Sequence, residues 1–354
     1  MPPSDHRTLP FVSLLIAAYN EETVIEERIR NALTMDYPTD KREIVIASDG
    51  SSDSTAAIAA RYADQGVRLF DYKERRGKAR VLNSALAELR GDIVLFSDAN
   101  TNYDPDAARM LARWFANRSI GIVCGRLVLT DPQTGSNADS LYWKFETFLK
   151  RNEGRLGALL GVNGAIYAMR RELYTPIPDG TLIDDFVIPL TARLRTGCHI
   201  VFDNDAIARE DTPPNIGSEF RRRSRIGTGG FQSLPVLWRL LNPMRGWIAF
   251  TFLSHKVLRW MCPFLLIGML AASSLLWMIP AYGALLLAQL AFYGVSFATA
   301  LAPAQHKPPK LLRLATMFTC MNIALLVGFG RWLWGSAQLG VWHRTIRPAE
   351  IQQS

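Results

Sequence analysis

The sequence predicts an α/β domain with a mostly parallel sheet, followed by apolar helices long enough to cross a membrane. Short apolar runs alternate with helix-like stretches over residues 11–130, as in sheets that are covered by helices. Acidic and amide side chains follow several of these runs, at the edge where such sheets bind ligands. Residues 260–306 contain no Asp, Glu, Lys or Arg, which is typical of membrane helices.

The elements of the first domain are expected in a regular order. Strands are expected at Val12–Ala18, Glu43–Ser48, Val67–Phe70, Ile93–Ser97 and Ile120–Thr130. Helices are expected at Glu21–Met35, Ser54–Ala63, Lys78–Leu89 and Asp106–Phe115, and less regularly around Asp139–Lys150 and after residues 182–186. A glycine-rich turn is expected over residues 157–171. The domain therefore spans residues 11–235, after a polar tail at 1–10 that is expected to be disordered.

The second half of the chain has the composition of a membrane region. Within residues 259–335, segments are expected at about 260–280, 282–303 and 314–334. The third is near the lower length limit for a span, and buried helices of a soluble core are the alternative for the first run. Residues 236–258 mix Trp, Leu and Phe with Arg and Lys, which fits either an amphipathic helix on the membrane surface or an ordinary packed helix. Residues 336–354 form a polar tail.

Charge and cysteine content restrict the location and the partners. The start of the chain has no export signal, so residues 1–235 are expected in the cytosol, on a multi-pass protein of the inner membrane. The four cysteines have no paired spacing, which disfavours a zinc site or a disulfide framework. The net charge of +8 is concentrated before the first apolar segment, which favours membrane lipids over nucleic acid as the partner.

The stretch "VLFSDANT" at residues 94–101 ends an apolar run with Asp98 and Asn100. Both residue types are common in turns, so these two can simply end a strand. Alternatively, oxygen ligands two residues apart on extended backbone point the same way and can hold one cation. The residues alone leave both readings open.

Six motifs occur together in a recognisable order. They read "IAAYNEE" (16–22), "ASDGSSDST" (47–55), "RGKARVLNSAL" (76–86), "FSDAN" (96–100), "GVNGAIYAMRR" (161–171) and "LIDDF" (182–186). With these the chain resembles the family-2 inverting glycosyltransferases of the GT-A fold. It is most similar to the membrane-bound branch that includes bacterial cellulose, chitin and hyaluronan synthases.

The resemblance implies how a nucleotide sugar would be held. Asp98 and Asn100 take the place of the family's Asp-x-Asp pair, which holds Mg²⁺ or Mn²⁺ on the diphosphate, although Asn100 brings no charge. Asp49 matches the acid that contacts the nucleoside, with a turn or helix-cap role as the alternative. The nucleotide-binding residues expected beside it are Ala18, Tyr19, Glu21 and Lys78.

The same resemblance assigns the acceptor side. Asp185 matches the general base that removes the acceptor's proton, and Asp184 would orient it. The alternative is that both acids only stabilise the start of a helix. Gly161, Asn163 and Gly164 match the loop beside the donor sugar and the acceptor.

One departure from the family concerns processive synthesis. Processive synthases have a "QxxRW" motif before the membrane, and here Arg222, Arg225 and Ile226 stand at its three positions. The arginines can face the departing diphosphate, but the aromatic platform for a growing chain is missing.

The expected function is transfer of a sugar, most simply from a UDP-sugar, to a lipid-linked or polysaccharide acceptor at the cytoplasmic face. The alternatives are a processive polysaccharide synthase and a non-catalytic membrane scaffold. A dimer or other exopolysaccharide-assembly proteins are expected as partners if the chain extrudes a polymer, because three apolar segments are few for a channel.

Overall fold

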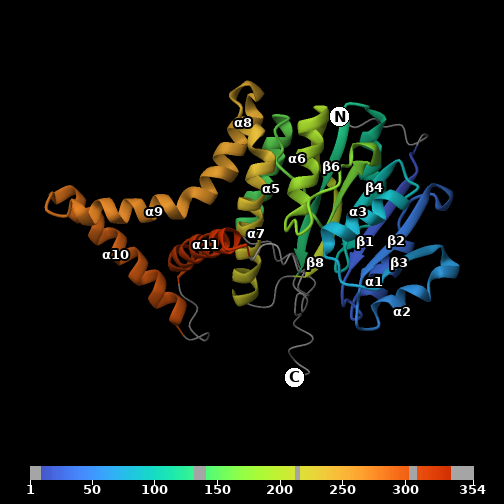
Figure 1. The fold of residues 1–354 in the computed structure, drawn as a ribbon, viewed down its shortest axis with the longest axis horizontal. Coiled ribbons are helices and arrows are strands. Elements are labelled where there is room, and N and C mark those ends of the chain that lie inside the picture. The colour runs from blue at the N-terminus through green and yellow to red at the C-terminus, as the bar shows by residue number, and fades with distance from the viewer. Residues whose placement is uncertain (1–8, 131–140, 212–215, 303–308, 336–354) are drawn as a thin grey trace. The chain divides into compact units, whose positions relative to one another are not determined.

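The computed structural model describes residues 9–130, 141–211, 216–302 and 309–335 (Figure 1). The predictions for the tail at 1–8, the helix start at 139 and the tail at 336–354 lie outside the described residues. The chain divides into two compact units, described here one at a time. The described part of the first unit covers 9–130, 141–211 and 233–252, and that of the second covers 216–232, 253–302 and 309–335.

The first unit contains an eight-stranded mixed sheet with the strand order β3-β2-β1-β4-β7-β6-β8-β5. Its strands are β1 (Val12–Ala18), β2 (Arg42–Asp49), β3 (Val67–Tyr72), β4 (Ile93–Asp98), β5 (Asn102–Tyr103), β6 (Ile120–Thr130), β7 (Tyr167–Arg170) and β8 (His199–Asp211). Strands β3, β2, β1 and β4 run parallel, whereas β7 pairs antiparallel with both β4 and β6. The five strands expected from the sequence are present, and β5, β7 and β8 are additional.

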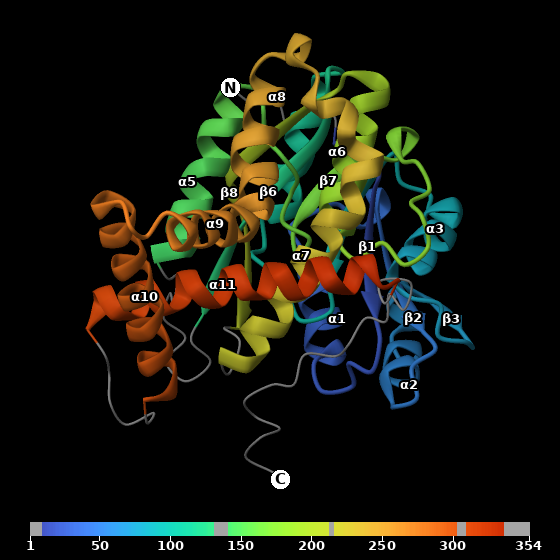
Figure 2. The same cartoon turned by 60° about the vertical axis from the view of Figure 1, so that its left-hand side comes forward.

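The helices follow the strands as the alternation predicts. They are α1 (Ile25–Leu33), α2 (Thr55–Ala60), α3 (Lys78–Glu88), α4 (Ala107–Ala112), α5 (Leu141–Arg155) and α6 (Asp184–Thr196). Every residue of β1 is buried, as expected for a central parallel strand with helices on the sheet faces. Helix α3 packs on β1 and β2 (Figure 2).

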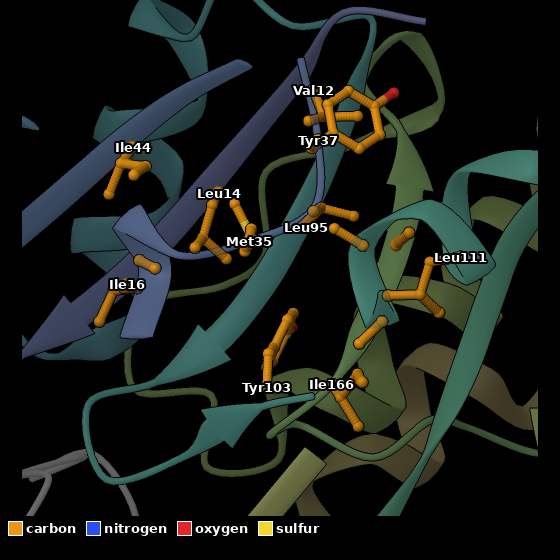
Figure 3. Close-up of a cluster of buried hydrophobic side chains, with 14 of the residues drawn as sticks. Val12, Leu14, Ile16, Met35, Tyr37, Ile44, Leu95, Tyr103, Leu111 and Ile166 are labelled. Atoms are coloured by element: carbon orange, nitrogen blue, oxygen red, sulfur yellow. The ribbon is translucent and has the colours of Figure 1, made fainter. Parts of the chain in front are cut away.

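The hydrophobic core joins the parallel strands to the helices that cover one of their faces. Side chains of alternate residues in β1, such as Leu14 and Ile16, point into it together with Ile44 of β2 and Leu95 of β4 (Figure 3). Full burial of one such side chain contributes about 1.5–3 kcal/mol. This core fixes the carboxyl ends of β1, β2 and β4 at one edge of the sheet.

The first unit ends with an irregular segment, Ser233–Phe252. It comprises the end of α7 (Ile216–Leu237), the 3₁₀ turns Trp238–Leu241 and Pro243–Arg245, and the short helix α8 (Trp247–Thr251). Gly246, with φ of 58°, makes the turn between the second 3₁₀ turn and α8, a conformation that favours glycine. Regular helix is thus interrupted between α7 and α8, around Pro243, a residue type that breaks helices.

The second unit is helical and includes α9 (Leu258–Leu275), α10 (Pro280–Leu301) and α11 (Lys310–Leu333), preceded by a π-helical turn at Phe252–Val257. Gly328 of α11 lies against the backbone of α7, where an added Cβ would stand 2.7 Å from the Thr228 nitrogen. Phe231 packs its ring against Trp260, Phe329 and Trp332. By length and composition, three helices among the described residues could cross a membrane: Trp247–Leu275, Pro280–Leu301 and Leu311–Leu333.

Candidate active site

Lys78 links two carboxylates that lie far apart in the sequence. It is the first residue of α3, and its Nζ lies 3.0 Å from Asp98 Oδ1 and 3.3 Å from Asp184 Oδ2. Burial alone would lower the pKa of the Lys78 ammonium, but the charges of Asp184 and Asp98 outweigh it and raise that pKa. The lysine therefore stays charged, and it joins the end of β4 to the start of α6.

Asp185 follows Asp184 in the first turn of α6 and is half-buried. Its pKa is raised because it is removed from water and because Asp184 places a second negative charge beside it, while Lys78 and Lys150 act in the opposite direction. A carboxylate with a raised pKa is a better proton acceptor than an ordinary aspartate. The electrostatics of Asp185 thus suit a general base.

The glycine-rich loop before β7 holds Asp185 in place. The Val162 amide donates a hydrogen bond to the Asp185 carbonyl at 3.1 Å. An added Cβ on Gly164 would lie 3.3 Å from Asp185 Oδ2, and one on Gly161 would lie 2.9 Å from the Phe186 ring. The two glycines therefore allow the loop to approach the start of α6 closely.

Asn163 connects this loop to β6 and to Lys150. Its Nδ2 donates to the Gly125 carbonyl at 2.6 Å, and its Oδ1 accepts a hydrogen bond from Lys150 Nζ. Lys150, on α5, was not among the predicted site residues, because a lone lysine on a helix carries no motif signal. The positive charge of Lys150 acts on Asp185 from α5 and lowers the pKa of that carboxyl group.

Tyr167 of β7 is a second residue that the sequence did not single out. It is fully buried, its ring stacks on Phe96 at 4.3 Å, and its hydroxyl has no hydrogen-bond partner among the described residues. Burial, followed by the charges of Asp184 and Asp185, raises the pKa of the Tyr167 hydroxyl, which therefore stays protonated. A tyrosine in an apolar strand is ordinary, so no sequence signal distinguishes it.

Asp49 shapes the loop that precedes Lys78. It is fully buried at the end of β2, and its two carboxylate oxygens accept hydrogen bonds from the Arg76 amide at 2.6 Å and the Gly77 amide at 2.9 Å. Charge-assisted bonds of this kind are stronger than neutral ones. Asp49 thereby positions the start of α3, and its contact with a nucleoside stays a prediction.

The other predicted nucleotide-binding residues lie after β1 at the same edge of the sheet. Ala18 is fully buried and Glu21 is nearly so. Tyr19 is half-exposed, and the Arg75 guanidinium stacks over its ring at 3.8 Å. This aromatic and cationic pair gives the edge a flat surface of the kind that a base can stack on.

The donor set at Asp98 and Asn100 fits a divalent cation that is shared with a substrate. Both side chains are half-buried, and Asn100 donates its amide to Glu210 Oε1 at 2.6 Å, which directs its carbonyl oxygen away from Glu210. In the described part of the chain, no group of three His, Cys, Asp or Glu residues is arranged to hold a metal by itself. Mg²⁺ commonly binds through one or two carboxylates plus substrate phosphates, which this oxygen pair can provide for.

Arg222 and Arg225 lie on the part of α7 that belongs to the second unit. Arg222 pairs with Glu219 at 3.1 Å. Their role beside a leaving diphosphate stays a prediction. In the first unit, the structure brings together Lys78, Asp98, Asp184, Asp185, Asn163 and Gly164.

Residues 13–175 match the family model described as Glycosyl transferase family 2. This part of the chain is therefore similar to glycosyl transferase family 2 domains. Its curated relatives include poly-β-1,6-N-acetyl-D-glucosamine synthases from Staphylococcus aureus (strain COL), 28% identical over 236 residues, and Staphylococcus epidermidis, 26% identical over 244 residues. These matches cover 63% and 65% of this chain but 55% and 57% of the relatives, so the chain spans little more than half of their length.

A solved structure supports the fold. A mannosyltransferase from Pyrobaculum calidifontis, in complex with GDP-mannose and Mn²⁺, superposes with a TM-score of 0.67 at 24% identity, over 93% of this chain and 88% of that one. The predicted fold class is confirmed: an α/β GT-A-type domain followed by three helices that could span a membrane.

Proposed function

We propose that the family 2 domain of this chain transfers a sugar from a nucleoside diphosphate sugar to a glycan hydroxyl, with inversion at the anomeric carbon. The observation that carries the proposal is the Lys78 bridge between Asp98 and Asp184. Lys78 joins Asp98, which is expected to lie beside the diphosphate, to the acid pair Asp184 and Asp185, which is expected to lie beside the acceptor. A purely structural acid pair at a helix start would not need a half-buried lysine shared with a distant strand.

The residues divide the reaction between them. Asp185 takes the proton from the acceptor hydroxyl as its oxygen attacks the anomeric carbon. The bond from that carbon to the phosphate oxygen breaks on the opposite face, and the diphosphate leaves with the electron pair. One such displacement inverts the configuration. Asp184, fixed by Lys78, holds the start of α6 so that Asp185 faces the acceptor.

Charge on the leaving diphosphate must be compensated. Mg²⁺ or Mn²⁺, when bound, would supply positive charge to the phosphate oxygens. In this chain Asp98 and Asn100 would hold the cation, and Lys78 would add its own charge on the Asp98 side. Arg222 and Arg225 of α7 are proposed to approach the same phosphates.

The substrate class follows from the family and the relatives. A UDP-sugar is proposed as donor, with Tyr19 and Asp49 on the nucleoside side. The synthases from the two staphylococci make a glycan polymer according to their names, which supports a glycan or lipid-linked acceptor here. Arg239, Arg245, Lys256 and Arg259 precede the apolar run, and by the positive-inside rule they support a cytoplasmic catalytic unit.

Transfer of a radiolabelled sugar in membranes tests the assignment. Asp185→Asn and Asp98→Ala should each abolish transfer, whereas Asp64→Asn, at an exposed position in the same unit, should leave it unchanged. Calorimetry of UDP with Mn²⁺ should show weakened binding for Asp98→Ala and nearly normal binding for Asp185→Asn. Undiminished transfer by both site variants would refute the proposal.

A second candidate is processive synthesis of a polysaccharide. The names of the relatives favour it, whereas Ile226 in place of the aromatic residue of the processive motif opposes it. Sizing of the radiolabelled product distinguishes the two. Short products at every reaction time would indicate single transfers, and long products early in the reaction would indicate processive synthesis.

A further inference from the structure

The segment Trp238–Phe252, here called the interfacial segment, exposes large apolar side chains. Trp238, Trp247 and Phe250 are 61%, 57% and 59% exposed, and Met244 is 91% exposed. Among the side chains that the structure describes in the first unit before position 212, which exclude those of 141–144, the exposed large apolar ones are Phe145, Phe148 and Leu156, in or just after α5. Exposed apolar clusters of this kind mark contact surfaces.

The opposite side of the interfacial segment is anchored in the first unit. Leu240 and Phe252 are fully buried. Thr251 Oγ1 lies 3.2 Å from the Ala158 carbonyl oxygen, at the start of the glycine-rich loop, and shares its single proton between that oxygen and the carbonyl oxygens of Trp247 and Ile248 in α8. The Phe252 ring stacks on Phe186, the residue after Asp185, with centroids 6.3 Å apart. Consecutive residues thus support the loop and the start of α6.

The continuation of the chain identifies what covers the exposed side. The candidate span that begins at Trp247 has 29 residues, which at 1.5 Å per residue is about 44 Å, longer than a hydrocarbon core of about 30 Å. Lys256 and Arg259 lie in its first half, so the hydrocarbon begins after Arg259. The residues that precede Arg259 then lie at the level of the lipid headgroups, where Trp is enriched.

Charge agrees with this placement. Arg239 and Arg245 lie within the interfacial segment, and neither it nor the rest of residues 233–259 contains Asp or Glu. Basic residues at the surface are attracted to anionic phospholipid headgroups. A protein partner would more often meet mixed charges at the rim of its contact surface.

We propose that the interfacial segment lies on the phospholipid surface through Trp238, Met244, Trp247 and Phe250, and that Thr251 and Phe252 transmit this support to the residues that hold Asp185. The role of Asp185 as a base rests on the proposed function. The coupling itself is structural and does not depend on that role. Contact with lipid limits the motion of α8, and α8 in turn limits the motion of the glycine-rich loop and of the first turn of α6.

Quenching by brominated lipids tests the lipid contact. The full chain is placed in nanodiscs of equal parts phosphatidylethanolamine and phosphatidylglycerol, brominated near the headgroup. The Trp238→Phe/Trp247→Phe variant should lose a clear part of the quenched tryptophan signal. Trp114→Phe, which removes a half-buried tryptophan bonded to Asp203, should leave the quenched part unchanged. An unchanged quenched signal in the double variant would overturn the lipid contact.

Amide exchange tests the coupling without any need for sugar transfer. The Val162 amide reports the hydrogen bond from the loop to Asp185. In nanodiscs, Trp247→Ser/Phe250→Ser should speed its exchange about tenfold, because loss of about 1.4 kcal/mol of apolar contact allows more frequent opening. The Trp247→Tyr/Phe250→Tyr variant should retain most protection, and Phe148→Ser on α5 should retain all of it.

Two outcomes would overturn the coupling. One is wild-type exchange at Val162 in the double serine variant. The other is acceleration that extends equally to core amides such as that of Leu15, which would indicate general destabilisation. If Val162 responds as expected but sugar transfer is absent from the wild type, the coupling stands and the proposed function fails.

Discussion

Replacing Lys78 with methionine tests the electrostatic centre of the site. The change keeps most of the side-chain length but removes the charge that lies 3.0 Å from Asp98 and 3.3 Å from Asp184. Removing one partner of a buried ion pair costs about 3–5 kcal/mol, because the other charge stays uncompensated. The three side chains are 19%, 30% and 11% exposed, so the lower end, about 3 kcal/mol, is expected.

Thermal unfolding of the detergent-solubilised full chain gives the measurement. For a domain of this size, about 3 kcal/mol corresponds to a fall in Tm of about 6–12 °C. The matched control is Lys73→Met, because Lys73 pairs with Asp71 but is 85% exposed. An exposed pair is worth about 0–1 kcal/mol, so the control should lower Tm by at most about 4 °C.

A second substitution separates charge from packing. In the Lys78→Met/Asp184→Asn variant one uncompensated carboxylate is gone, so part of the lost stability should return. If Lys78→Met shifts Tm no more than Lys73→Met does, the bridge is not a significant part of the site. If the fall in Tm of the double variant equals the sum of the falls of the two single variants, the lost stability comes from packing and the charge argument is wrong.

Three further predictions concern the groups around this centre. Lys150→Gln should raise the pKa of Asp185 further, because the charge of Lys150 lowers that pKa. The proposed base is then still protonated at a higher pH, so the acidic limb of the pH profile of kcat should move to higher pH. Asp49→Asn should cost about 1–3 kcal/mol in thermal stability and weaken UDP binding in calorimetry, because one buried loop amide loses its acceptor. Gly164→Ala should lower kcat about tenfold or more with little change in the KM for the donor, because the added methyl group displaces the Asp185 carboxylate, 3.3 Å away.

The parallel half of the sheet could be predicted because its local signals agree. Each of its strands is a short apolar run, each helix follows with its own polar face, and the boundaries of β1 match the prediction. The proposed metal ligands Asp98 and Asn100 and the acid pair Asp184 and Asp185 could be named only because six motifs occur in order. In isolation, Asp185 has the same pattern as an acid that stabilises a helix start.

The other half could not be predicted for physical reasons. β7 has only four residues, and the first three of them end the short apolar run 165–169, where periodicity does not distinguish strand from turn. β8 contains polar residues in its middle, where the register with β6 shifts between Cys124 and Arg126. Arg28 is 1% exposed and donates to Ser97, although an arginine on a short helix normally faces water.

The antiparallel strand β7 has a consequence for how such a domain can be recombined. The four parallel strands come from one continuous stretch of chain, 12–98, and β7 separates them in the sheet from the strands that follow. A hybrid chain could therefore keep the residues up to 118 and take everything after residue 118 from a relative. Its seam would have to restore two backbone pairings, β4 with β7 and β5 with β8. It would also have to restore ion pairs across the join, among them Lys78–Asp184, Arg80–Asp179, Arg113–Asp203 and Arg209–Asp104.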